Sequence, residues 1–102
     1  MVQVVWSGPA VDDLREIHDY IARDSPRYAR LTVERIQEAA AMLAESPRMG
    51  PILPEIPRGP YRRVRVGSYR VVYREDPPGR RVLVVGIIHG ARNLPPILEE
   101  RE

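Results

Sequence analysis

The chain has 102 residues, no cysteine, two histidines and a formal net charge of +2. This length suits one domain with a modest core, and the lack of cysteine excludes a disulfide framework and the commonest soft metal ligand. The longest apolar run, from Val82 to Ile88, is far too short for a membrane span, and no signal peptide precedes Trp6. We therefore expect a cytoplasmic protein without a metal or cofactor.

The charge is divided unevenly along the chain. Residues 1–57 carry six arginines and nine acids, a net −3, whereas residues 58–102 carry ten arginines and five acids, a net +5. All 16 basic residues are arginine, whose planar guanidinium binds phosphate or carboxylate through paired hydrogen bonds. A basic C-terminal half suggests a nucleic acid or an acidic protein as partner.

The N-terminal half has the pattern of one strand followed by two helices. Residues 2–6 are mostly apolar, and Ser7 is placed as a helix N-cap with a proline in the first turn. Ser25 is again followed by proline, so the first helix should end near Asp24 and the second near Ser46. Because almost no linker separates the helices, they should form an antiparallel hairpin.

Residues 47–60 contain five prolines, which forbid regular structure and predict one ordered loop. Strands are then expected at about 61–66, 69–75 and 80–89. The last of these is apolar on both faces, so it should be central in the sheet.

Gly67 and Ser68 predict a two-residue type II′ turn between the first two of these strands. With this turn, Val66 faces Tyr69 across the hairpin. Alternation then buries the apolar side chains on one face. The other face carries four arginines: Arg63, Arg65, Arg70 and Arg74. Like charges on neighbouring strands repel, so these side chains either stay hydrated or face a negatively charged partner.

Together these elements predict an α+β fold of order βααβββ, with the helical hairpin packed on one face of a small antiparallel sheet. The N-terminal strand is expected to lie antiparallel to its neighbour. Residues 1–92 would form a single domain, and residues 93–102 a C-terminal tail.

Three residues are candidates for an acid–base site. If they approach one another, Glu55 would be the general base, Arg70 the electrostatic stabiliser and His89 the general acid. RNA cleavage through its own 2′-OH needs only such groups and no metal. Arg92, three residues after His89, would add a phosphate-binding side chain. A structural explanation stands beside each role, because an isolated histidine is usually structural and a loop carboxylate is usually solvated.

The order and spacing of several motifs resemble the RelE/ParE superfamily of bacterial type II toxin–antitoxin toxins. The resemblance covers nearly the whole chain. Its motifs are Trp6-Ser7, Asp13-Leu14, Tyr20-Ile21, the Ser46-Pro47…Gly50…Pro54-Glu55 loop, the Tyr69–Arg74 strand and His89-Gly90-Ala91-Arg92.

The resemblance implies two rival activities. ParE-like members act on DNA gyrase without a recognised catalytic site, whereas RelE-like and YoeB-like members cut mRNA on the ribosome. Glu55, Arg70 and His89 match the functional Glu, Arg and His of the YoeB branch. Where that branch has a tyrosine this chain has Gly90, and it has none of the lysines of RelE-like sites. We therefore favour the ParE-like branch.

Either branch implies a cognate antitoxin and hence a hetero-oligomer. The apolar grooves beside the helical hairpin and the basic sheet would receive the largely disordered C-terminal segment of that antitoxin. The partner-binding candidates are Arg63, Arg65, Arg70, Arg74 and Arg92. A non-toxic RNA- or protein-binding module is the third possibility, because one fold can host several functions.

Overall fold

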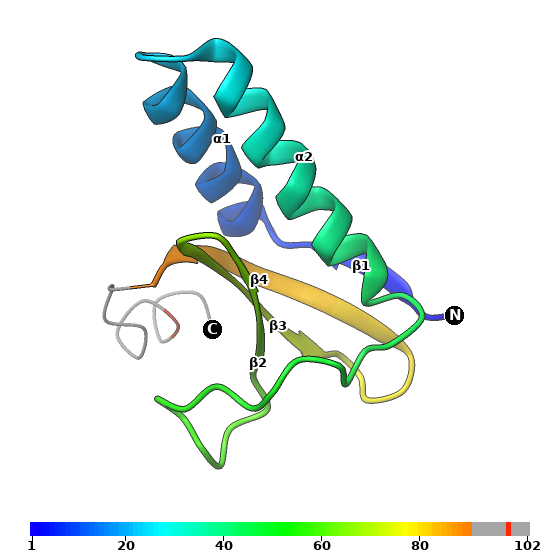
Figure 1. The fold of residues 1–102 in the computed structure, drawn as a ribbon. Helices are drawn as coiled ribbons and strands as arrows, with labels where there is room; N and C mark the ends of the chain where they lie inside the picture. The colour runs from blue at the N-terminus through cyan, green and yellow to red at the C-terminus, as the bar shows by residue number, and fades with distance from the viewer. Residues whose placement is uncertain (91–97, 99–102) are drawn as a thin grey trace.

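The computed structural model describes residues 1–90 and residue 98, in which a helical hairpin stands on one face of a four-stranded sheet (Figure 1). The elements in chain order are β1 (Gln3–Trp6), α1 (Gly8–Ala22), α2 (Pro26–Met42), β2 (Arg62–Val66), β3 (Tyr69–Glu75) and β4 (Arg81–His89). This order confirms the predicted α+β, βααβββ architecture. Within the described residues, no helix is both long enough and apolar enough to cross a membrane.

Both helices begin at the predicted serine caps. The side-chain oxygen of Ser7 accepts the N–H of Ala10 at 3.2 Å, and that of Ser25 accepts the N–H of Tyr28 at 3.1 Å. Each serine thereby satisfies a backbone donor that has no partner within the first helical turn. Both helices end slightly earlier than predicted.

Strands β2, β3 and β4 form the predicted antiparallel meander. Gly67 has a φ of 57° and Ser68 has no positive φ, which agrees with the expected two-residue turn. Val66 pairs with Tyr69, so the predicted register is confirmed. The strand order β1-β4-β3-β2 also confirms that β4 is an interior strand.

The predicted direction of the first strand is wrong, because β1 runs parallel to β4 and the sheet is mixed, with Gln3 beside Arg81. The connection through the helices explains this direction. The N–H of Val2 donates to the carbonyl of Ala44 at 2.8 Å, so the chain leaves α2 beside the start of β1. β2 therefore begins at the same end of the sheet as β1, and two hairpins later β4 runs the same way.

Different parts of the chain cover the two faces of the sheet. On the helical face, the core contains Ala10, Ile36, Ala40, Val71, Val84 and Ile87. On the opposite face, the loop of residues 47–60 (Figure 1) packs with the sheet in a second core. That core contains Leu53, Tyr61, Val72, Val85, Ile88 and Leu98. The face predicted to carry four arginines is therefore partly an apolar core.

The loop of residues 47–60 is fastened along the edge of β2. The N–H of Leu53 donates to the carbonyl of Tyr61 at 2.9 Å, and the N–H of Gly50 donates to the hydroxyl of Tyr73 at 3.1 Å. These bonds fix the part of the loop that leads to Glu55. The predicted tail of residues 93–102 lies outside the described residues except for Leu98, which is buried in the second core.

Candidate functional site

Glu55 and Arg70 form a two-pronged ion pair on the sheet face opposite the helices. Arg70 Nη1 donates to Glu55 Oε1 at 3.0 Å, and Arg70 Nη2 lies 2.7 Å from Glu55 Oε2. The Arg70 side chain is only 6% exposed, and that of Glu55 is 30% exposed. Arg70 Nη2 also donates to the carbonyl of Gly90 at 3.3 Å. One guanidinium therefore joins the loop, β3 and the end of β4.

This ion pair stabilises the charged form of Glu55. The hydrogen bond from Arg70 is the main cause that lowers the pKa of Glu55, partial burial opposes it, and the nearby charge of Arg63 lowers the pKa further. A general base works best when its pKa lies near the working pH. The shift moves Glu55 away from that value, so the geometry suits a structural clamp better than a proton acceptor.

His89 lies on the helical side of the sheet. It pairs across the strands with Tyr69, which packs against the helical core, and the two rings meet edge to face with centroids 5.8 Å apart. Arg70 pairs with Ile88, which packs in the second core. Because cross-strand partners share one face of a sheet, the structure brings Glu55 and Arg70 together and leaves His89 on the opposite face.

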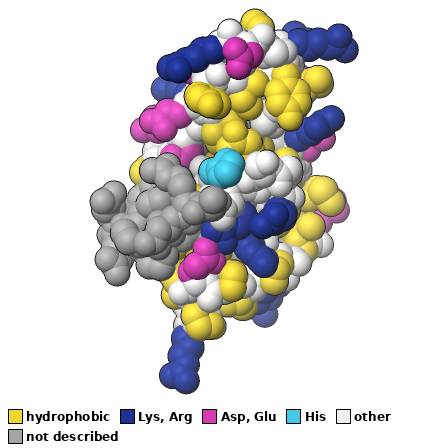
Figure 2. All heavy atoms as spheres, turned by 60° about the vertical axis from the view of Figure 1, so that its left-hand side comes forward, with side chains coloured by type: hydrophobic (Ala, Val, Ile, Leu, Met, Phe, Trp, Pro, Cys, Tyr) yellow, Lys and Arg dark blue, Asp and Glu magenta, His cyan; other side chains and the backbone are white. Residues whose placement is uncertain are grey.

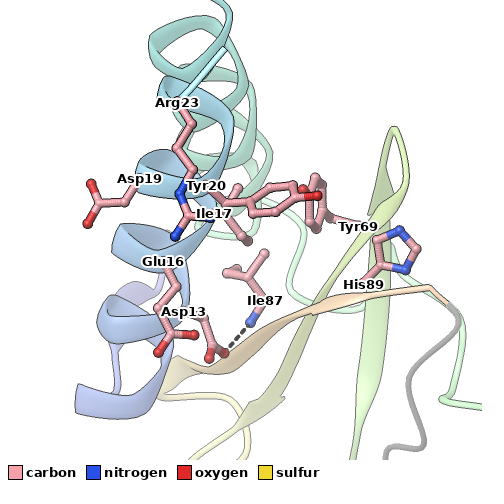
Figure 3. Close-up of a pocket in the computed structure, with 9 residues that line it drawn as sticks. All are labelled: Asp13, Glu16, Ile17, Asp19, Tyr20, Arg23, Tyr69, Ile87 and His89. Atoms are coloured by element: carbon pink, nitrogen blue, oxygen red, sulfur yellow. Dashed lines mark hydrogen bonds between the residues drawn. The ribbon is translucent and has the colours of Figure 1, made fainter. Parts of the chain in front are cut away.

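A groove of about 650 Å³ opens beside His89, between α1 and the end of β4 (Figure 3). Tyr20 and Tyr69 point toward each other across it, and Asp13 and Glu16 line its α1 side. A second hollow of about 310 Å³ shares Tyr69 and His89 and continues toward α2. Within the described residues, no three His, Cys, Asp or Glu side chains are grouped to hold a metal ion.

Asp13 fastens α1 to β4 at the floor of this groove. Its Oδ2 accepts the N–H of Ile87 at 2.9 Å, and the residue is 9% exposed. β1 pairs with β4 only as far as Val84, so this carboxylate takes the place of a neighbouring strand for Ile87. The hydroxyl of Ser7 acts in a similar way by donating to the carbonyl of Val85 at 3.2 Å.

The other predicted partner-binding arginines differ in their surroundings. Arg63 and Arg65 lie on β2 and form no ion pair with any residue that the structure describes. Arg74 Nη1 lies 3.4 Å from Asp76 Oδ1. Arg92 lies outside the described residues. Figure 2 shows arginine side chains gathered in one patch with an acidic side chain at its border.

Comparison with known proteins assigns the chain to a family. A model of the family described as the ParE toxin of the type II toxin–antitoxin system parDE matches residues 4–94. The chain belongs to the ParE toxin family. This ParE-family chain is also 46% identical over 50 residues to Toxin RelE2 of Caulobacter vibrioides. That match covers 49% of this chain and 57% of the RelE2 toxin, so it spans little more than half of the relative.

Two solved structures share the fold of this ParE-family chain. The chromosomal ParDE toxin–antitoxin system of P. aeruginosa matches with a TM-score of 0.72 at 24% identity, over 87% of this chain and 96% of that one. The toxin–antitoxin complex RelBE2 of Mycobacterium tuberculosis matches with a TM-score of 0.60 at 24% identity. That match covers 86% of this chain and 96% of the RelBE2 chain. The family-model match over residues 4–94 confirms the resemblance to the RelE/ParE superfamily, and these two structures share its fold.

Asp13 and the aromatic walls of the groove were not among the site residues predicted for this ParE-family chain. The sequence marked Asp13 as part of the Asp13-Leu14 motif of the resemblance. Its spacing carried a usable signal, because it lies three residues after Ala10 and four before Ile17, on the inward stripe of α1. An acid on such a stripe needs a buried partner. No comparable pattern marks Tyr20, which is exposed on the helix surface.

Proposed function

We propose that this ParE-family chain is the toxin of a type II toxin–antitoxin pair and stops growth by binding DNA gyrase through protein contacts. The observation that carries this proposal is the separation of the candidate acid–base residues. Glu55 and Arg70 are paired on one face of the sheet, and His89 lies on the other. A general acid and a general base must both reach the reacting atoms of one substrate, and groups on opposite faces of a sheet are poorly placed to do so.

The burial and the hydrogen bonds of Arg70 support the same function. A side chain that stabilises a developing phosphate charge must be able to reach the substrate. Arg70 is 5% exposed, and both of its terminal nitrogens already bind oxygens of the protein. We therefore assign Glu55 and Arg70 a structural role, in keeping with a toxin that acts by contact.

A cognate antitoxin is the second partner in this proposal. Both structural neighbours were solved as toxin–antitoxin systems, and we extend that assembly to this chain as a hetero-oligomer. The groove beside His89 and the adjoining second hollow offer a suitable contact surface, because Tyr20 in the groove is 69% exposed and Tyr28 in the hollow is 55% exposed. Exposed tyrosine is typical of protein interfaces, and a disordered antitoxin segment would become ordered on binding.

A pair of reactions tests the target. The purified full-length toxin is added to a gyrase supercoiling reaction and, at the same concentrations, to an in vitro translation reaction in which mRNA cuts are mapped. We expect blocked supercoiling and intact mRNA. Cut mRNA together with normal supercoiling would replace the gyrase target with the ribosome.

The variant His89→Ala sharpens this test, because it removes the one candidate acid while leaving the Glu55–Arg70 pair in place. If the toxin acts by contact with gyrase, the amount of this variant needed to arrest growth should stay within about threefold of the wild-type amount. That ratio corresponds to less than about 1 kcal/mol. Loss of both arrest and mRNA cleavage in His89→Ala would instead identify a nuclease.

A further inference from the structure

The sheet half of the molecule contains more arginines than its acids can neutralise. Residues 46–90 hold nine arginines and three acids. Those three acids are already paired with Arg48, Arg70, Arg74 and Arg81. Within the described residues, five arginines have no carboxylate at ion-pair distance: Arg58, Arg62, Arg63, Arg65 and Arg80.

Two of these five, Arg63 and Arg65, lie side by side on one face of β2, at the edge of the sheet. Residues two apart on a strand are separated by about 7 Å. Both line a hollow of about 230 Å³ together with Gly50 and Pro51 of the loop. Side chains alternate along a strand, so Arg62 belongs to the other face of β2, and its Nη1 donates to the carbonyl of Gly50 at 2.8 Å. We call Arg63 and Arg65 the β2 arginine pair.

Among the residues that the structure describes, no neighbour cancels the charge of this pair. Arg65 lies directly opposite Arg70 in the sheet, and Arg70 takes up the charge of Glu55. Arg63, Arg65, Arg70 and Glu55 therefore carry a net charge of +2 among them. Like charges on adjacent strands cost stability, and a negatively charged ligand would relieve that repulsion.

The surroundings of the pair favour a phosphate backbone over exposed bases. Proteins that bind single-stranded nucleic acid stack the bases on accessible aromatic rings. Here Tyr61, which shares the face of the pair, is 6% exposed. Tyr69 and Tyr73 of β3 pack on the helical side of the sheet, and the strongly exposed Tyr20 and Tyr28 lie on the helical hairpin. Arginines without a stacking surface suit double-stranded DNA, whose bases are paired and whose phosphates face outward.

We propose that the β2 arginine pair contacts the phosphates of double-stranded DNA, and that the toxin uses this contact on DNA held by gyrase. The second half of this statement rests on the function proposed above, whereas the first half does not. The toxin would bind gyrase more tightly when DNA is present, because two phosphate contacts add to the protein contacts.

Direct binding tests the contact with DNA. The full-length toxin is titrated into a fluorescently labelled 20-base-pair duplex at a series of NaCl concentrations, and anisotropy gives the binding constant. Each neutralised phosphate contributes about 0.9 to the slope of log K against log salt. The double variant R63Q/R65Q should therefore reduce the slope by about 1.8 and weaken binding at every salt concentration.

The variant R27Q/R30Q is the matched control. Arg27 and Arg30 are exposed on α2, and neither forms an ion pair with a described residue. The control removes the same number of positive charges at another place. If its salt slope equals that of the wild type, the effect of R63Q/R65Q belongs to the β2 arginine pair. An equal loss in both variants, or no salt-dependent binding by the wild type, would overturn the proposal. So would tighter binding of single-stranded RNA or of polyglutamate than of the duplex.

Gyrase inhibition separates this proposal from the function on which it partly rests. We expect R63Q/R65Q to need at least about tenfold more toxin for half-inhibition of supercoiling, a change of 1.4 kcal/mol. Equal inhibition by wild type and R63Q/R65Q would overturn the contact on gyrase-held DNA and leave the gyrase target standing. A wild type that binds the duplex through these arginines but does not inhibit gyrase would overturn the target and leave the DNA contact standing.

Discussion

Arg70 is a charged side chain in the interior of a small sheet, and a single carboxylate compensates most of its charge. The ion pair with Glu55 supplies two short contacts, yet Arg70 Nε is buried and has no hydrogen-bond partner in the described part of the chain. Removing water from two charges costs free energy that their attraction offsets only with good geometry. The pair is therefore sensitive to the loss of one partner, while its net contribution to stability is small.

The variant Glu55→Ala should reveal this sensitivity, because it leaves the buried guanidinium without its carboxylate. We expect the free energy of unfolding to fall by about 2–3 kcal/mol, somewhat less than for a fully buried pair, since Glu55 is partly exposed. Urea titration of wild type and variant measures the difference. The double variant E55L/R70M should recover most of the loss, and a Glu55→Ala effect below about 0.5 kcal/mol, as at a surface position, would contradict a buried clamp.

The same pair gives stability a pH dependence with a definite sign. Arg70 lowers the folded-state pKa of Glu55, so this contribution is complete above the unfolded-state value of about 4.3 and is lost as the pH falls through the lower folded-state pKa. Glu75 behaves alike because Arg48 lowers its pKa. Thermal midpoints of wild type and Glu55→Gln between pH 7 and 3 should therefore converge at the acid end. A constant difference across this range would show that Glu55 does not titrate in this way.

At the scale of elements, the loop of residues 47–60 depends on one close approach of backbone to backbone. A Cβ atom added at Gly50 would lie 2.3 Å from the carbonyl oxygen of Arg63, whereas one at Gly8 would meet nothing within 4 Å. Gly50→Ala must therefore push the loop away from β2 and strain the hydrogen bond to Tyr73. We expect a loss of about 3 kcal/mol or more, as for other overpacked sites, and no loss for Gly8→Ala. Thermal unfolding of the two variants makes the comparison.

The contact between α1 and β4 also depends on one residue, Asp13, which accepts a hydrogen bond from β4. Asp13→Ala would leave the N–H of Ile87 without its acceptor, at a cost of about 1–3 kcal/mol, whereas Asp13→Asn keeps a carbonyl oxygen there and should cost less. Amide hydrogen exchange followed by NMR tests this locally, because the Ile87 amide should exchange faster in the alanine variant. Unchanged protection of that amide would mean that the bond contributes nothing.

The sequence was enough to predict elements that depend on interactions between residues close together in the chain. It was not enough for those that depend on residues far apart. The caps at Ser7 and Ser25 and the turn at Gly67 are local, so their residues were enough to predict the helix starts and the register of β2 with β3. The direction of β1 depends on where the helical hairpin returns the chain, which leaves no pattern in β1 itself. The burial of Arg70 likewise depends on a loop that has no periodicity.

The candidate site was predictable in its residue types but not in its assembly. Their residue types and the resemblance to the YoeB branch suggested that Glu55, Arg70 and His89 belong together, and the first two do form a pair. Alternation along β4 could have separated the third, since His89 lies two residues after Ile87 on the helical side. That inference needed one further fact, namely which face the loop of residues 47–60 covers.

At the scale of the whole molecule, the proposed antitoxin should act as a stabilising ligand. A partner that binds only the folded toxin raises the free energy of unfolding by about 2.7 kcal/mol when it is free at 100 times its dissociation constant. The thermal midpoint of the toxin should therefore rise with antitoxin concentration. Differential scanning fluorimetry across an antitoxin titration measures this, and a midpoint independent of concentration would mean that the two proteins do not bind.

The parallel pairing of β1 with β4 has a consequence for how the protein is made. The third residue of the chain pairs with the eighty-first, Gln3 with Arg81, and β4 also supplies the inner neighbour of β3. Contacts this distant in sequence form late and fold slowly. A nascent chain on the ribosome therefore holds β1 unpaired until β4 has been translated. The sheet is completed only after β4 has been made, which would give the proposed antitoxin the interval before that pairing in which to meet the chain.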